Sequence, residues 1–215
     1  MGTKKLHDKA EKVYSTLAAE YPDATIELNF SNPLELLVAT VLSAQCTDKK
    51  VNQVTDTLFR KYKRPEDYLK VDAEELEQDI RATGFYRQKT KSLRGIMQAL
   101  TEHYAGKLPR DLESMTALPG IGRKTANVVL GNAYGVPGIA VDTHVKRVSN
   151  RIGLTTNTNP EKIERDLMNL FAQADWVQLS HVFIFHGRYK CKARTPACDT
   201  CPITGECDFF QQGKP

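Results

Sequence analysis

The strongest constraint on the fold is the recurrence of apolar residues at helical spacing along almost the whole 215-residue chain. In one segment, for example, Leu34, Leu37, Val38 and Val41 fall on a single face with the period of an α-helix. Residues 26–30 could form a strand, but they are too few and too isolated to build a sheet. The pattern therefore predicts an all-α fold.

Glycine and proline mark the joints between the predicted helices. Asn32, Pro33 and Glu35 supply an N-cap, a proline at the first helical position and a glutamate that can bond back to the cap, so a helix is expected from there to about Gln45. The tail after Cys207 is short and is expected to fray. The other expected helices cover residues 5–20, 48–63, 72–82, 87–105, 111–117, 123–134, 142–152, 160–173 and 175–190.

The composition is that of a globular protein with a sizeable core, since 40% of the residues are hydrophobic and 26% are charged. The longest apolar runs, such as residues 182–185, are far too short to span a bilayer. Residues 1–20 mix lysines with carboxylates and do not look like a targeting segment. We therefore expect a cytoplasmic protein with no membrane partner.

The formal net charge is only +4, but the signs are sorted along the chain. Residues 66–79 hold seven carboxylates, whereas residues 80–101, 114–141 and 176–198 hold none. Three acid-free windows could form one electropositive surface that binds DNA, or they could be three unrelated solvated faces. The charge pattern alone leaves both readings open.

Four of the five cysteines lie within 17 residues, as Cys191, Cys198, Cys201 and Cys207, with the spacing C-x6-C-x2-C-x5-C. A disulfide framework is not expected in a chain without a secretion signal, so the cluster predicts a metal site. Its spacing is compatible with zinc or with an iron–sulfur cluster. Cys46 stands apart and is interpreted as a small buried residue at a helix end.

A glycine turn precedes an apolar helix in the segment Leu-Pro-Gly-Ile-Gly-Arg-Lys-Thr-Ala, residues 118–126. Gly120, Gly122 and Arg123 would expose backbone N–H groups and a cation at a helix start, which suits a phosphate group. The spacing is not that of an ATP-binding P-loop. It fits a helix-hairpin-helix that grips one DNA backbone, although a purely structural turn would also explain it.

Lys124 lies in the first turn of that helix, where the helix dipole disfavours a cation. It could attack a sugar carbon as a Schiff-base nucleophile, or it could simply contact a phosphate. Asp142 precedes another helix and could be its N-cap, or it could stabilise positive charge on a sugar as a base departs. The remaining histidines are interpreted as ordinary surface or core residues of amphipathic helices, namely His7, His103, His181 and His186.

Taken together, these motifs closely resemble the endonuclease III family of helix-hairpin-helix DNA glycosylases and abasic-site lyases. The resemblance rests on residues 118–130, on Val-Asp-Thr-His-Val at 141–145, on Leu-Ser-Ala-Gln at 42–45 and on the cysteine spacing, and it extends over about residues 5–210. It implies an all-α fold of two lobes: a six-helix domain at residues 25–136 with the hairpin, and an iron–sulfur cluster domain at residues 1–24 and 137–215. It also implies a monomer, cytoplasmic and associated with the nucleoid.

The resemblance implies a bifunctional enzyme of base excision repair. Its substrate would be double-stranded DNA that contains damaged pyrimidines or abasic sites, from which it removes oxidised pyrimidines after flipping the nucleotide out of the duplex. Lys124 would attack C1′ and nick the strand by β-elimination, with Asp142 as the assisting carboxylate. Gln45 and Phe85 would fill the gap in the duplex. The other implied DNA contacts are Gly120, Gly122, Arg123, Thr143, His144, Lys192 and Arg194. The four clustered cysteines would bind a [4Fe-4S] cluster.

Three other readings remain. A relative that removes adenine or mismatched thymine without nicking would lack Lys124, and an adenine-removing one would carry a carboxylate in the helix at residues 36–45, where this chain has none. A DNA-binding module with a structural cluster would keep its properties without Lys124, and a redox carrier would not need the residues that bind duplex DNA.

Overall fold

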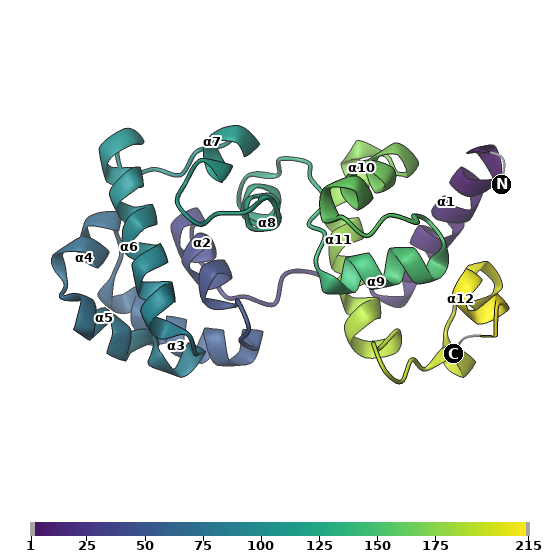
Figure 1. Ribbon diagram of the computed structural model, residues 1–215, viewed down its shortest axis with the longest axis horizontal. Helices are drawn as coiled ribbons and strands as arrows, with labels where there is room; N and C mark the ends of the chain where they lie inside the picture. The colour runs from purple at the N-terminus through teal and green to yellow at the C-terminus, as the bar shows by residue number, and fades with distance from the viewer. Residues whose placement is uncertain (1–2, 214–215) are drawn as a thin grey trace. The chain divides into compact units, whose positions relative to one another are not determined.

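The computed structural model describes residues 3–213 and confirms the predicted all-α fold, because no strand occurs among these residues (Figure 1). The chain divides into two compact units. One unit consists of Glu27–Val136, and the other joins the residues up to Ile26 to those from Pro137 onwards. No helix among the described residues is both long enough and apolar enough to cross a membrane.

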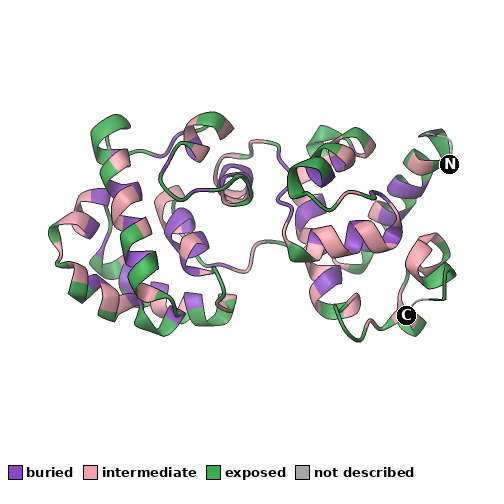
Figure 2. Ribbon diagram, in the orientation of Figure 1, coloured by how far each residue is buried: buried purple, intermediate pink, exposed green. Residues whose placement is uncertain are grey.

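The unit Glu27–Val136 is built around two buried helices, α2 and α6, whose apolar faces carry side chains such as Leu36, Leu37, Leu93 and Met97 that have no exposed surface (Figure 2). The helix α8 packs against α2, and α4 and α5 pack against α6. The helices of this unit are α2 (Pro33–Leu42), α3 (Asp48–Lys61), α4 (Pro65–Lys70), α5 (Ala73–Ile80), α6 (Tyr86–His103), α7 (Leu112–Thr116) and α8 (Arg123–Tyr134), with a 3₁₀ turn at Arg81–Thr83.

Two local features of this unit differ from the expectation. The short helix α4 was not expected, because its six residues are too few to show a helical period. It is held instead by Asp67, which accepts bonds from the amides of Lys63 and Arg64, and by the buried Tyr68. The helix α2 begins at the predicted cap but ends at Leu42 rather than near Gln45, because Gln45 has a φ of 53° that an α-helix cannot contain.

The other unit has its own core, made by one face of each of its longer helices. Val13 and Leu17 from α1 pack there with Val145 and Val148 from α9 and with Phe183 from α11. Beyond α11 the helix widens into a π-helical turn, in which the amide of Cys191 bonds to the carbonyl of His186. The helices are α1 (Thr3–Glu20), α9 (Thr143–Ile152), α10 (Pro160–Leu170), α11 (Trp176–Phe185) and α12 (Asp208–Gln211), and the π-helical turn is His186–Lys190.

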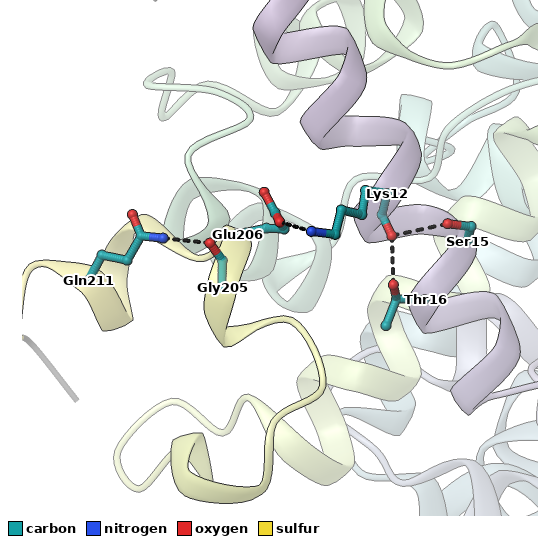
Figure 3. Close-up of polar contacts among 6 residues, drawn as sticks. All are labelled: Lys12, Ser15, Thr16, Gly205, Glu206 and Gln211. Carbon is teal, nitrogen blue, oxygen red and sulfur yellow. Dashed lines mark hydrogen bonds and ion pairs between the residues drawn. The ribbon is translucent and has the colours of Figure 1, made fainter.

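The described part of the tail after Cys207, residues 208–213, does not fray as expected but forms α12 and attaches to α1; residues 214 and 215 lie outside the described residues. The ammonium of Lys9, which is 5% exposed, lies 2.6 Å from the carboxylate of Asp208. Figure 3 shows a second connection, in which Lys12 pairs with Glu206, while Gln211 bonds back to the carbonyl of Gly205 at 2.6 Å. The expectation failed because the residues of each lysine–carboxylate pair are almost 200 residues apart in sequence, so no local pattern indicates the pairing.

Candidate DNA-binding and catalytic site

The predicted hairpin is present as a tight turn between α7 and α8. Leu118 and Ile121 anchor it in the core, and the amide of Ile121 bonds to the carbonyl of Leu118 at 3.1 Å. Gly120 has a φ of 77°, so the turn itself requires glycine there. Gly122 has an ordinary φ of −85°, and a methyl group on it would meet nothing within 4 Å. The fold therefore does not require a glycine at position 122, whereas close approach of an external ligand would.

Gly122 is the N-cap of α8, and its lack of a side chain means that no cap bond reaches the first-turn amides of the helix. Arg123 and Lys124 are the first two residues of this helix, and both side chains are exposed. The turn thus presents backbone N–H groups, the positive end of a twelve-residue helix and a lysine amine on the same exposed surface. That combination suits a phosphate with a reactive group beside it.

Gln45 and Phe85 occupy two loops of the same unit, and both have left-handed backbone conformations, with φ of 53° and 48°. Such a conformation costs a residue with a side chain about 1–2 kcal/mol. Among the described residues only one other non-glycine residue, Ala105, has a positive φ. Phe85 is 66% exposed, which makes it the most exposed large hydrophobic residue described, so it is not part of the core.

Asp142 belongs to the other unit, where it is the N-cap of α9. Its Oδ1 accepts bonds from the amides of His144 at 2.7 Å and Val145 at 2.9 Å. Both bonds end on the same oxygen, so Oδ2 takes no part in the cap. The cap reading of Asp142 is therefore correct, and it leaves one half-buried carboxylate oxygen for chemistry.

The neighbours of Asp142 differ in exposure. Thr143 is exposed, whereas His144 is half-buried and its Nδ1 lies 3.0 Å from the guanidinium of Arg147. Burial lowers the pKa of His144, and the nearby Arg147 and Arg188 lower it further against the opposing effect of Asp142. The ring is therefore neutral at pH 7 and accepts the bond from Arg147.

The four clustered cysteines are free thiols that line one pocket. Burial, together with the neighbouring thiols, raises the pKa values of Cys198 and Cys201. Among residues 3–213, no three histidine, cysteine or carboxylate side chains converge closely enough to hold a single metal ion. The thiols instead surround a space with apolar walls that include Ile152, Pro196 and Ile203. A sulfur-rich donor set around such a space fits an iron–sulfur cluster.

Two arginines of α9 that belong to none of the predicted motifs hold this segment in place. Nη1 of Arg151 donates to the Sγ of Cys191 at 3.3 Å and to the carbonyl of Lys192 at 2.8 Å, and Nη2 donates to the carbonyl of Ala193 at 2.8 Å. The carbonyl of Cys191 accepts from Nε of Arg147 at 3.0 Å. Their spacing could have indicated that both arginines lie on one face of a helix, since 147 and 151 are one turn apart on the helix that Asp142 caps.

The loop that follows Cys191 carries two of the predicted DNA contacts. Its backbone is held by the bonds from Arg151, and the side chains of Lys192 and Arg194 are both exposed. His186 is a core residue near the cysteine segment. It is 1% exposed, and its ring nitrogens lie 3.3 Å from the hydroxyl of Tyr21 and 3.8 Å from the Sγ of Cys201.

Comparisons with known proteins agree with these features. The HhH-GPD superfamily of base excision DNA repair proteins matches residues 38–173. The iron–sulfur binding domain of endonuclease III matches residues 191–207, the interval bounded by the outer two cysteines. Endonuclease III from Bacillus subtilis (strain 168) is 52% identical over 188 residues, which cover 87% of this chain and 86% of that protein.

Solved structures give the same answer for the whole chain. A trapped endonuclease III–DNA covalent intermediate has a TM-score of 0.92 and 44% identity, with full coverage of both chains. A non-covalent endonuclease III–DNA complex has a TM-score of 0.90 and 47% identity, covering 95% of this chain and 97% of that one. The matches also confirm the predicted [4Fe-4S] cluster as the cofactor. The chain belongs to the endonuclease III family of HhH-GPD base excision DNA repair proteins.

Proposed function

We propose that this chain removes oxidised pyrimidines of the thymine glycol type from double-stranded DNA and nicks the strand with Lys124 as its nucleophile. As a member of the endonuclease III family, it is a DNA glycosylase and abasic-site lyase, and its partner is DNA. The observation that carries the role of Lys124 is its place, exposed in the first turn of α8 beside the amides that suit a phosphate. An amine held there lies within reach of the sugar attached to that phosphate.

The reaction of Lys124 proceeds in two stages. Its neutral amine attacks C1′, the bond from C1′ to the base breaks, and the base leaves with the electron pair and takes up a proton. The attached amine then loses one proton, and its lone pair forms a protonated imine at C1′ while the bond from C1′ to O4′ breaks, with its electron pair and a proton going to O4′. Removal of a proton from C2′ next expels the 3′ phosphate oxygen with the electrons of its bond to C3′, and water releases Lys124 from the imine.

Asp142 is proposed as the carboxylate that assists these steps. Its Oδ1 is committed to the α9 cap, so the group is held in one orientation. The remaining oxygen can stabilise positive charge on the sugar as the base departs, and it can accept a proton from the attacking amine. Helix capping and catalysis thus use different oxygens of the same side chain.

The flipped nucleotide leaves a gap in the duplex that must be filled. Gln45 and Phe85 are proposed to fill it, since both side chains are exposed on loops of the unit that carries the hairpin. The hairpin residues Gly120, Gly122 and Arg123 are proposed to hold the backbone of the damaged strand. Thr143, His144, Lys192 and Arg194 are the further proposed contacts.

Cys191, Cys198, Cys201 and Cys207 are proposed to bind the [4Fe-4S] cluster. When bound, the cluster joins four points of this short segment and supplies no reacting group. The chain's own contribution is the loop with Lys192 and Arg194, which Arg151 holds by its backbone. We also propose that the protein acts as a monomer in the cytoplasm, in association with the nucleoid.

The test is borohydride trapping of the purified protein on a duplex with a single thymine glycol. The wild type is expected to form a covalent adduct, because borohydride reduces the imine to a stable amine. Lys124→Ala should bind the duplex but form no adduct. Lys162→Ala is the matched control, because it removes an exposed lysine of α10 that has no proposed role in binding DNA, and it should still form the adduct. A wild type that binds the lesion duplex, and also an abasic duplex, without any adduct would refute the proposal.

A further inference from the structure

We propose that Lys89 is a positioning residue that joins the loops of Gln45 and Phe85, so that both side chains enter the duplex as one element. This inference rests on the proposed function, because it concerns how the gap left by the flipped nucleotide is filled. All the residues involved lie in the unit Glu27–Val136, and the contacts between them are internal to that unit.

Lys89 lies in the first turns of α6, and its ammonium bridges two segments that are distant in sequence. It donates to the carbonyl of Leu42, the last residue of α2, and to the carbonyl of Thr83, the last residue of the 3₁₀ turn, both at 2.8 Å. Its own backbone amide donates to the carbonyl of Phe85 at 3.0 Å. Lys89 therefore bonds to the residue at the start of the Gln45 loop and to two residues of the Phe85 loop.

The acceptors explain why a lysine is placed there. The carbonyl of Leu42 is one of the last of α2, which leaves it without a partner inside the helix and at the negative end of the helix dipole. The carbonyl of Thr83 comes just before Gly84, where the backbone turns away with a φ of 72°. An ammonium group has three donors, so it can satisfy both carbonyls at once.

The burial of Lys89 indicates a role beyond capping the C-terminal end of α2. The residue is 5% exposed, and both of its side-chain partners are neutral carbonyls rather than a carboxylate. Burial lowers the pKa of Lys89, which reflects the cost of removing a cation from water. A methionine or leucine would fill the same space without that cost, but it could not hold the two loops at a fixed separation.

The two loops need such a constraint because each has an unfavourable backbone. Gln45 and Phe85 are in left-handed conformations, which persist only when the surroundings fix them. The anchor points are close to these residues, since Leu42 lies three positions before Gln45 and Thr83 two positions before Phe85. If the separation of the loops varied, the two side chains could not fill one gap together, and extrusion of the nucleotide would become less favourable.

The experiment compares nicking at one abasic site in a duplex with nicking of the same strand when it is single-stranded, under single-turnover conditions with saturating enzyme. Only the duplex requires a base pair to be opened and a gap to be filled. Lys89→Met should nick the duplex about tenfold more slowly and the single strand at nearly the wild-type rate. Fluorescence of 2-aminopurine opposite an uncleavable abasic analogue should rise with the wild type and rise much less with Lys89→Met.

Arg94→Met is the matched control. Arg94 also lies on α6 and also donates to backbone carbonyls, those of Tyr68 at 3.1 Å and Val71 at 2.7 Å, but these belong to the end of α4. The variant Arg94→Met removes a comparable set of side-chain bonds to backbone carbonyls from the same unit. It should leave the ratio of duplex to single-strand rates unchanged. Lys89→Arg keeps the charge and the donors, so it should restore most of the ratio.

The outcomes separate the two proposals. An equal loss on both substrates, or an unchanged ratio, from a folded Lys89→Met would overturn the role of Lys89 and leave the lyase assignment intact. A wild type that nicks neither substrate would overturn the proposed function and this inference with it. If Lys89→Met does not fold, the same ratio is measured for Lys89→Gln, whose shorter amide cannot reach both carbonyls, and the same reduced ratio is expected.

Discussion

The guanidinium of Arg151 lies 3.3 Å from the Sγ of Cys191, as a hydrogen-bond donor to a proposed ligand of the cluster. The same guanidinium holds the next two carbonyls of the loop and stacks over the ring of Phe209 at 4.4 Å from its centre. Helix α9 is therefore connected at one end, through its cap, to the proposed catalytic carboxylate, and near the other to the cluster segment.

Arg151→Leu is expected to shorten the lifetime of the cluster. The change removes a charge-assisted hydrogen bond, which typically contributes about 1.5–3 kcal/mol, and it frees the backbone of the loop. The visible absorbance of the cluster should decay several-fold faster than in the wild type when the protein is exposed to air and chelator. Arg165→Leu is the control, because Arg165 has only an exposed ion pair with Glu161 on α10. Equal decay in both variants would contradict the role assigned to Arg151.

Gly120→Ala is expected to lower the stability of the fold, whereas Gly122→Ala is expected to weaken DNA binding. Gly120 has a φ of 77°, so alanine there should lower the free energy of unfolding by about 1 kcal/mol or more. Gly122 has an ordinary φ and open space around it, so Gly122→Ala should leave the melting temperature unchanged and weaken binding to an abasic duplex. Thermal unfolding and a binding titration for each variant check the pair. Unaltered binding by Gly122→Ala would mean that no phosphate approaches this turn.

Asp142→Asn and Asp142→Ala should separate capping from chemistry. Asparagine is as good an N-cap as aspartate, so Asp142→Asn should melt near the wild-type temperature while losing most of its glycosylase activity, because the amide carries no charge. Asp142→Ala removes the bonds to His144 and Val145 as well and should be about 1 kcal/mol less stable. Melting curves and base release from a thymine glycol duplex are the measurements. Full activity in Asp142→Asn would restrict Asp142 to its cap.

His181 should contribute to loss of stability in mild acid. Burial lowers its pKa below the ordinary value of 6.5, so the unfolded chain takes up a proton at a higher pH than the folded one. Its contribution is fully present above pH 6.5 and is lost as the pH falls toward its lower folded pKa. The free energy of unfolding in urea should therefore decrease less between pH 7.5 and pH 5 for His181→Leu than for the wild type. Identical slopes would show that His181 does not titrate on unfolding.

The sequence predicted those parts of the fold and site that depend on local pattern. The α2 cap, the turn at Gly120 and the cap at Asp142 each require a few residues at fixed spacing, and each was found at the predicted place. The burial of Lys89 was missed, although it falls on the apolar face of α6 at helical spacing from Leu93, where a lysine is unexpected. The spacing of Arg151 from Arg147 indicated only a shared helix face. The partners of Arg151 and His186 could not be predicted, because they lie 15 to 165 residues distant.

The pairing of Lys9 with Asp208 has a consequence for how the protein is made on the ribosome. Helix α1 emerges long before the residues that cover it, such as Phe183 and Asp208. The unit Glu27–Val136 is continuous and can fold while synthesis continues. The apolar face of α1 therefore stays uncovered until the residues from Pro137 onwards have been synthesised.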